Sequence, residues 1–95
     1  MAYLLATNGL DRGQAYELVL GNNVIGRDAD CDVHLNFPSV SRKHVRLVAD
    51  DPHFTISDLE SANGTKINGH PLTNPVSLQP GDVITIADLE FSFVL

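Results

Sequence analysis

The sequence predicts an all-β sandwich of about ten short strands. Apolar and polar residues alternate in short runs, which is the period-two pattern of half-buried strands. Gly, Pro, Asn and Asp separate these runs at intervals of about 8–12 residues or less, as in all-β domains. No stretch combines a 3.6-residue apolar period with capping residues, so we expect no helix. In such a fold the loops at the strand ends carry the function.

Each expected strand is a short apolar run bounded by turn residues. The first run leads into the turn-rich segment 8–13, and the Gly-Asn-Asn triplet at 21–23 breaks the second run. Two Asn-Gly pairs, at 63–64 and 68–69, indicate tight turns around a very short element. The expected strands are 2–8, 14–20, 24–27, 32–35, 44–49, 53–59, 83–86 and 89–94.

Length and composition favour one globular domain, residues 1–95. A chain of 95 residues buries roughly 60–65% of its unfolded surface, which is enough for one modest core. The single cysteine, Cys31, cannot form an internal disulfide, and no apolar run is long enough to span a membrane. We therefore expect a cytoplasmic, monomeric domain. Because its last residues read as a strand that continues to the chain end, we expect it to be part of a longer protein.

The charge distribution predicts a site for one small anion. The net charge is −6, which argues against nucleic acid or an anionic membrane as the main partner. Residues 38–48 nevertheless hold three of the six basic side chains (Arg42, Lys43 and Arg46) and no acid. The other 84 residues hold three basic and twelve acidic side chains. A basic segment this compact suits a single anionic group.

Metal chemistry is poorly supported. Asp28, Asp30 and Asp32 have the alternate spacing that opens a calcium-binding loop. Val33, however, stands where that loop needs Gly, and Ser39 stands where it needs the closing Glu. The four histidines show no recurring ligand spacing. We expect a solvated acidic turn and neither a metal nor a cofactor.

Catalysis is also poorly supported, although Ser41 and His44 lie three residues apart. The G-x-S-x-G nucleophile elbow, the Walker loop and the dinucleotide fingerprint are all absent from the sequence. We therefore expect a binding protein and no enzyme.

Two segments could together capture a phosphate group, which needs a guanidinium, hydroxyl donors and free N–H groups. Arg27 follows Gly26 at a strand end, and the loop after Pro38 offers two serines, an arginine and a lysine. If the segments are adjacent, Arg27 and Arg42 converge near Ser41. In the alternative, Arg27 pairs with the acidic segment 28–32 in a surface cluster of little energetic value.

Three motifs in this order, GR at 26–27, SRKH at 41–44 and DLESANGTKING at 58–69, closely resemble a forkhead-associated (FHA) domain. The spacing is similar too, with fourteen residues from Arg27 to Ser41 and nineteen from His44 to Asn63. Each motif alone is common, but the ordered set is specific. The resemblance implies a sandwich of about ten to eleven mostly antiparallel strands, with loops at one end that bind phosphothreonine peptides.

The resemblance also implies a role for each matching residue. Arg27, Ser41 and Arg42 would hold the phosphate, and Asn63 would bond the peptide backbone. His44 would be neutral and hydrogen-bonded between the loops, because Arg42 and Lys43, the two cationic residues before it, disfavour a charged imidazole. The remaining matches would be structural, in tight backbone positions or in the hairpin after the site: Gly26, Gly64, Thr65 and Asn68.

Three residues bear on specificity. Ala62 departs from the polar residue that the family often has before Asn-Gly, and this loss could cost about tenfold in affinity. Ser39 is small and uncharged where a residue after the phosphothreonine would be read, and Lys43 is expected to face solvent. Ala62 keeps open an alternative function, a phosphate-independent interaction or oligomerisation module on the same fold.

Overall fold

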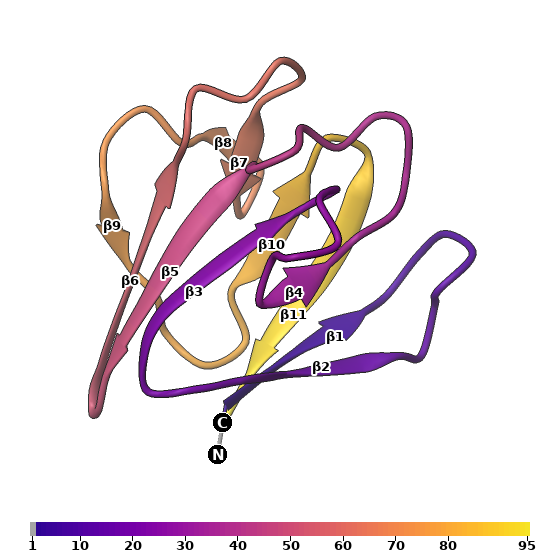
Figure 1. Ribbon diagram of the computed structural model, residues 1–95. Helices are drawn as coiled ribbons and strands as arrows, with labels where there is room; N and C mark the ends of the chain where they lie inside the picture. The colour runs from indigo at the N-terminus through magenta and orange to yellow at the C-terminus, as the bar shows by residue number, and fades with distance from the viewer. Residues whose placement is uncertain (1) are drawn as a thin grey trace.

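The computed structural model describes residues 2–95 as eleven strands in two stacked sheets, without a helix among these residues (Figure 1). This confirms the predicted all-β sandwich. Nothing in the described part of the chain forms a helix that could cross a membrane.

The first sheet contains six strands in the order β2-β1-β11-β10-β7-β8, and its pairings are antiparallel. The second sheet contains five strands in the order β4-β3-β5-β6-β9, with β3 and β4 parallel and the other pairs antiparallel. The first sheet is formed by β1 (Ala2–Ala6), β2 (Ala15–Leu18), β7 (Thr65–Ile67), β8 (His70–Pro71), β10 (Val83–Ile86) and β11 (Leu89–Val94). The second is formed by β3 (Gly21–Gly26), β4 (Val33–His34), β5 (Val45–Asp50), β6 (His53–Asp58) and β9 (Val76–Ser77).

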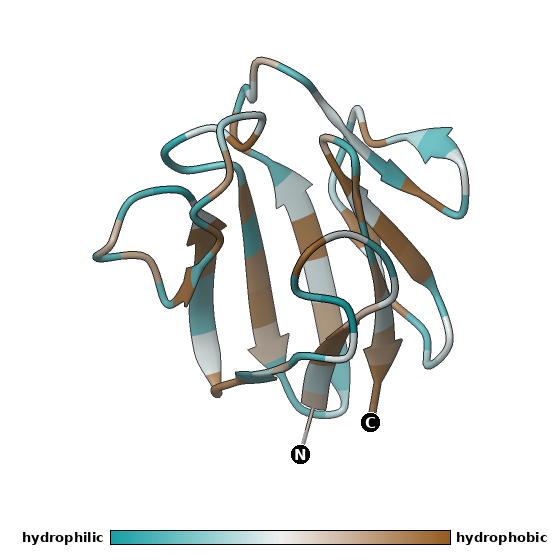
Figure 2. Cartoon of the chain, turned by 90° about the vertical axis from the view of Figure 1, so that its right-hand side faces the viewer, coloured by the Kyte–Doolittle hydropathy of each residue, from teal (hydrophilic) through white to brown (hydrophobic). Residues whose placement is uncertain are grey.

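One apolar core lies between the sheets. Alternate residues of β1, β5 and β11 are buried, as the period-two pattern predicts, and the alternation appears as brown and paler bands along the strands in Figure 2. Phe54 of β6 and Phe93 of β11 meet across the two sheets, edge to face, with ring centroids 5.0 Å apart. This shared core holds the two sheets as one unit.

The predicted break between the second and third strands exists, but it lies at residues 19–20 and not at 21–23, because β2 ends at Leu18 and β3 begins at Gly21. The buried side chain of Asn23 accepts a hydrogen bond from the Val19 N–H at 2.9 Å and donates to the Val19 carbonyl at 2.8 Å. These bonds replace backbone pairing at the turn before β3, so a polar residue is stable inside the sheet. The strand is therefore longer than residue type alone predicts.

Three loop segments lie together at one end of the sandwich. They join β3 to β5, β6 to β7, and β10 to β11, and Figure 1 shows them at the top, far from the C-terminal end of the chain. The sequence-predicted site residues fall mainly in the first two of these segments.

Candidate functional site

Backbone pairing brings the two segments of the predicted anion site side by side. The Arg27 N–H donates to the Ser41 carbonyl at 3.0 Å, and the Asp28 N–H donates to the Arg42 carbonyl at 3.1 Å. The loop before β5 thus lies directly against the loop after β3. Arg27, Ser41 and Arg42 are brought together although fourteen residues of sequence separate the first two.

Gly26 makes this close approach possible. A Cβ atom on Gly26 would lie 2.2 Å from the Arg42 carbonyl oxygen and 2.8 Å from its carbon. Because both are backbone atoms, the clash could not be relieved by turning a flexible side chain. The position therefore requires glycine for steric reasons.

The Arg27 side chain is exposed, and its Nε donates to the Val40 carbonyl at 2.9 Å. Among residues 2–95 it forms no ion pair, so the alternative with the acidic segment does not occur. Lys43 takes that place, with Nζ at 3.6 Å from Asp28 and 3.4 Å from Asp30. The single bond from Nε fixes the guanidinium and leaves its terminal nitrogens available to an anion.

Arg42 and Lys43 are neighbours with different surroundings. The negative charge of Asp30, above all, raises the pKa of the half-exposed Lys43. The exposed Arg42 side chain, in contrast, has no hydrogen bond or ion pair to any described residue. Arg42 is therefore the cation that remains free beside Arg27.

The hydroxyl of Ser41 is held so that its proton is available. Its Oγ accepts a hydrogen bond from the Ala62 N–H at 2.9 Å, and nothing between residues 2 and 95 accepts from it. A hydroxyl has one proton to donate. Ser41 can therefore donate to an anion without losing an internal bond. Ala62 contributes only its backbone here, and its side chain is exposed.

His44 is fully buried and joins two loops. Its Nδ1 accepts from the Ser41 N–H at 3.0 Å, so the proton is on Nε2, which donates to the Gly64 carbonyl at 2.9 Å. This arrangement describes a neutral imidazole. It also separates His44 from the Ser41 hydroxyl, so the two residues do not form the hydrogen-bonded pair of a serine nucleophile and its base.

Asn63 connects the β6–β7 loop to the loop before β5. It is exposed, and its Nδ2 donates to the Ser39 carbonyl at 2.7 Å. Oδ1 and the second amide proton have no partner within the described residues. An amide can accept one hydrogen bond and donate another at the same place, which matches an extended peptide backbone.

Asp58, which sequence reasoning missed, holds the β6–β7 loop. Its carboxylate accepts from the Ser61 N–H at 2.9 Å, the Ser61 hydroxyl at 2.6 Å and the Thr65 hydroxyl at 2.6 Å. Burial alone would raise the pKa of Asp58, but these three bonds outweigh it and lower the pKa. The spacing of Asp58 and Ser61, three residues apart, is typical of such local side-chain capping and could have indicated it.

Gly64 also belongs to this loop and Thr65 begins β7 directly after it, whereas Asn68 lies farther along the chain. Thr65 is buried, and the Gly64 carbonyl accepts from both His44 and the Ala87 N–H. Asn68 lies in the β7–β8 turn, where its Oδ1 accepts from the Val83 N–H at 2.9 Å. The structure therefore does not bring Asn68 to the other predicted residues.

A second residue that sequence reasoning missed is Asp88. Its Oδ1 accepts from the Ser39 hydroxyl at 2.7 Å. The two residues are 49 positions apart, and no local pattern indicates the contact. Asp88 thus belongs to the same end of the molecule as Arg27 and Asn63.

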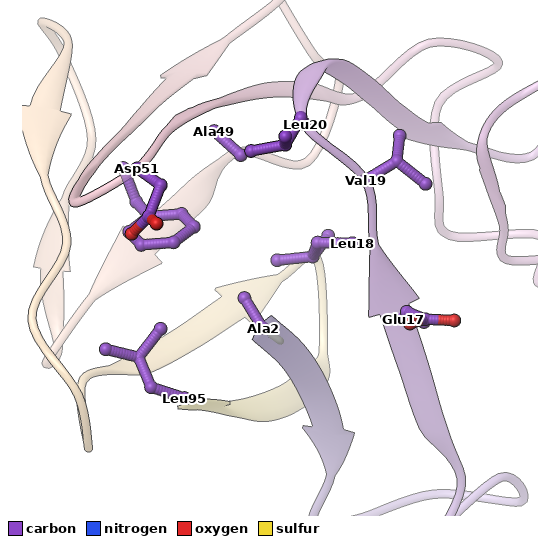
Figure 3. Close-up of a pocket in the computed structure, with 9 residues that line it drawn as sticks. Ala2, Glu17, Leu18, Val19, Leu20, Ala49, Asp51 and Leu95 are labelled. Carbon is purple, nitrogen blue, oxygen red and sulfur yellow. The ribbon is translucent and has the colours of Figure 1, made fainter.

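A cleft of about 440 Å³ lies elsewhere, near the β5–β6 hairpin and the C-terminal end of the chain (Figure 3). Mainly apolar side chains line it, among them Leu18, Leu20 and Phe54, together with the acids Glu17 and Asp51. It contains none of the sequence-predicted site residues. In residues 2–95 no three His, Cys, Asp or Glu side chains converge as metal ligands.

The chain is similar to known proteins in sequence and in fold. The family model for the FHA domain matches residues 23–87. The transcriptional regulatory protein EmbR of Mycobacterium tuberculosis is 36% identical over 93 residues, which cover 98% of this chain and 23% of EmbR. The proliferation marker protein Ki-67 of Homo sapiens is 34% identical over 86 residues, which cover 90% of this chain and 3% of Ki-67. The chain thus spans a small part of these relatives.

Solved structures are similar over almost the whole chain. One, from a structural and functional study of phosphothreonine-dependent FHA domain interactions, has a TM-score of 0.90 and 33% identity, covering 99% of this chain and 95% of its own. Mycobacterium tuberculosis EmbR, solved in complex with a low-affinity phosphopeptide, has a TM-score of 0.88 and 35% identity, covering 98% of this chain and 24% of its own.

Proposed function

Because this chain belongs to the FHA domain family, we propose that it binds phosphothreonine peptides and so mediates phosphorylation-dependent protein–protein interaction. The observation that carries the proposal is the backbone pairing of Arg27 with Ser41 at 3.0 Å. It joins the backbones of the two segments that carry Arg27, Ser41 and Arg42, and guanidinium and hydroxyl groups are the donors that a phosphate monoester needs.

In the proposed complex, the phosphate lies between Arg27, Arg42 and Ser41. The terminal nitrogens of Arg27 and the free guanidinium of Arg42 supply charge-assisted hydrogen bonds. Ser41 donates its hydroxyl proton while still accepting from Ala62. Lys43 contributes less, since it pairs with Asp30.

Asn63 holds the peptide backbone beside the phosphothreonine. Its bond to the Ser39 carbonyl fixes the amide plane and leaves Oδ1 and one amide proton for the ligand. Gly26, His44, Gly64 and Thr65 act on binding indirectly, because they keep the loops in place.

We also propose that residues 1–95 act as one monomeric, non-catalytic module of a longer cytoplasmic protein. The core shared by both sheets supports a single module. The net charge of −6 favours a phosphopeptide over nucleic acid or an anionic membrane as the partner. The binding-module character of FHA domains supports a role without catalysis.

The first test compares a fluorescently labelled phosphothreonine peptide with its unphosphorylated twin by fluorescence anisotropy. We expect Arg27→Ala to weaken binding of the phosphopeptide at least about tenfold, because it removes charge-assisted bonds to the phosphate. Arg46→Ala is the matched control, since it removes the same charge from an exposed position in β5. Thermal unfolding of both variants checks that the fold is retained.

Equal binding of the two peptides by the unmodified domain would contradict the proposal. If Arg27→Ala still captures the partner protein as well as the unmodified domain does, the phosphate-independent interaction module is the better description. Ala62, which offers no polar side chain to a phosphate, is the feature that favours this second function.

A further inference from the structure

The turn between β10 and β11 forms a third wall of the proposed peptide site. The Ala87 N–H donates to the Gly64 carbonyl at 3.1 Å, next to Asn63. The Ser39 hydroxyl donates to Asp88 Oδ1 at 2.7 Å, and the Ser39 carbonyl accepts from Asn63 at 2.7 Å. Ser39 therefore lies between Asp88 and Asn63, with a direct hydrogen bond to each.

Asp88 is held in this position from the opposite side as well. Asn8 donates from Nδ2 to the Asp88 carbonyl at 3.1 Å, and its Oδ1 accepts from the Glu90 N–H at 2.7 Å. Ala87 has a positive φ of 57°, so the turn is tight. The carboxylate therefore projects from a braced turn, and its place beside Ser39 is set by the fold.

The charge of Asp88 is not compensated. The side chain is exposed, and no Lys or Arg among the described residues pairs with it. Lys43 pairs with Asp28 and Asp30. Asp88 Oδ2 accepts no hydrogen bond from residues 2–95.

We infer that Asp88 selects phosphothreonine peptides that carry Lys or Arg within a few residues of the phosphothreonine, on the side where the peptide passes Ser39. The inference rests on the proposed function, since it needs a peptide held by Asn63. A basic side chain there forms an exposed ion pair with Asp88, and an acidic one is repelled. Exposed pairs of this kind change Kd by about two- to five-fold.

The test uses a set of peptides with one phosphothreonine in an otherwise uncharged sequence. A single Lys, Gln or Glu is placed in turn at each of the neighbouring positions, and Kd is measured by fluorescence anisotropy at low and high salt. We expect Lys to be preferred over Glu by about four-fold or more at one or two positions, with a smaller preference at high salt, where exposed charges are screened.

Three variants connect the preference to Asp88. Asp88→Asn should abolish the preference for Lys over Glu, because the negative charge is lost. The amide oxygen can still accept the hydrogen bond from Ser39, so the turn keeps its place. Asp88→Lys should invert it in favour of Glu. Glu17→Gln, the matched control, removes one exposed acid beside the distant cleft and should leave the preference unchanged.

The outcomes separate this inference from the function on which it rests. If phosphopeptides bind better than their unphosphorylated twins but Lys and Glu peptides bind equally, the role of Asp88 is wrong and the proposed function stands. The role is also wrong if the preference persists in Asp88→Asn. If phosphorylation makes no difference to any peptide, both are wrong.

Discussion

At the scale of single residues, the imidazole of His44 uses both ring nitrogens inside the protein. The ring accepts a hydrogen bond from the Ser41 N–H and donates one to the Gly64 carbonyl. The backbone carbonyl of His44 accepts a third hydrogen bond, from the Leu59 N–H. The charge pattern of the sequence predicts a neutral, hydrogen-bonded histidine at this position. It cannot predict which nitrogen has the proton, since that depends on the Ser41 and Gly64 backbone groups, which fold into place from different loops.

We predict that His44→Ala destabilises the domain by about 2–5 kcal/mol, because it leaves a cavity and two partly buried backbone groups without their partner. Binding of the phosphothreonine peptide should also weaken, since the Ser41 and Asn63 loops lose their connection. His53→Ala, a substitution at an exposed position in β6, should change stability by less than about 0.5 kcal/mol. Chemical denaturation measures both, and similar unfolding curves for the two variants would refute this role.

At the scale of elements, the alternation of apolar and polar residues predicts the strands. The shapes of the loops depend instead on side-chain hydrogen bonds, which this alternation does not predict. The β6–β7 loop is an example. Asn63 and Gly64 are recognisable as a turn, but the shape of the loop depends on Asp58, which accepts from Ser61 and Thr65. The very short strands β7, β8 and β9 also depend on their neighbours, since two or three residues have too little pattern of their own.

Asp58 should make the stability of the domain sensitive to acid. Its pKa in the folded protein is below the ordinary value of 3.8, so its stabilising effect is complete above that pH. The effect is then lost as the pH falls from 3.8 through the lower, folded-state pKa. We predict that the free energy of unfolding declines more steeply below about pH 4 in the unmodified domain than in Asp58→Asn.

Urea denaturation at a series of pH values measures this difference. At neutral pH, Asp58→Asn should be the less stable protein, by about 1–2 kcal/mol. Both carboxylate oxygens of Asp58 accept hydrogen bonds, whereas an amide has one acceptor oxygen, so at least one bond from Ser61 or Thr65 is lost. Parallel declines of the two proteins with acid would show that Asp58 is not the responsible group.

At the scale of the whole molecule, the site depends on a core that lies below it. The loops arise from both sheets, and the two sheets are joined by contacts such as that between Phe54 and Phe93. The hydrophobic pattern predicts which faces are buried. It does not predict which buried residue of one sheet meets which residue of the other, because that depends on the register and twist of both sheets.

Phe93→Ala should destabilise the domain by about 3–5 kcal/mol, since it removes a fully buried ring and its contact with Phe54. A small domain has a total stability of about 5–15 kcal/mol, so this variant should unfold well below the temperature of the unmodified protein. Val94→Ala, at the adjacent and exposed position, should have a small effect. Circular dichroism during heating measures both, and equal Tm values would contradict the assigned core.

The sequence by itself determined the all-β class, most of the strands, and the set of Arg27, Ser41, Arg42 and Asn63 as candidates. The strands follow from a period of two and from turn residues, and the full set of candidates follows from the resemblance of three ordered motifs to the FHA family. Only the tertiary structure decided that Lys43 pairs with the acidic turn while Arg27 stays free, and that Asp88 joins the site through Ser39. The physical reason is that ion pairs between exposed side chains differ little in energy, so the sequence alone does not favour one partner over another. The partner that forms the pair is the one that the fold brings close.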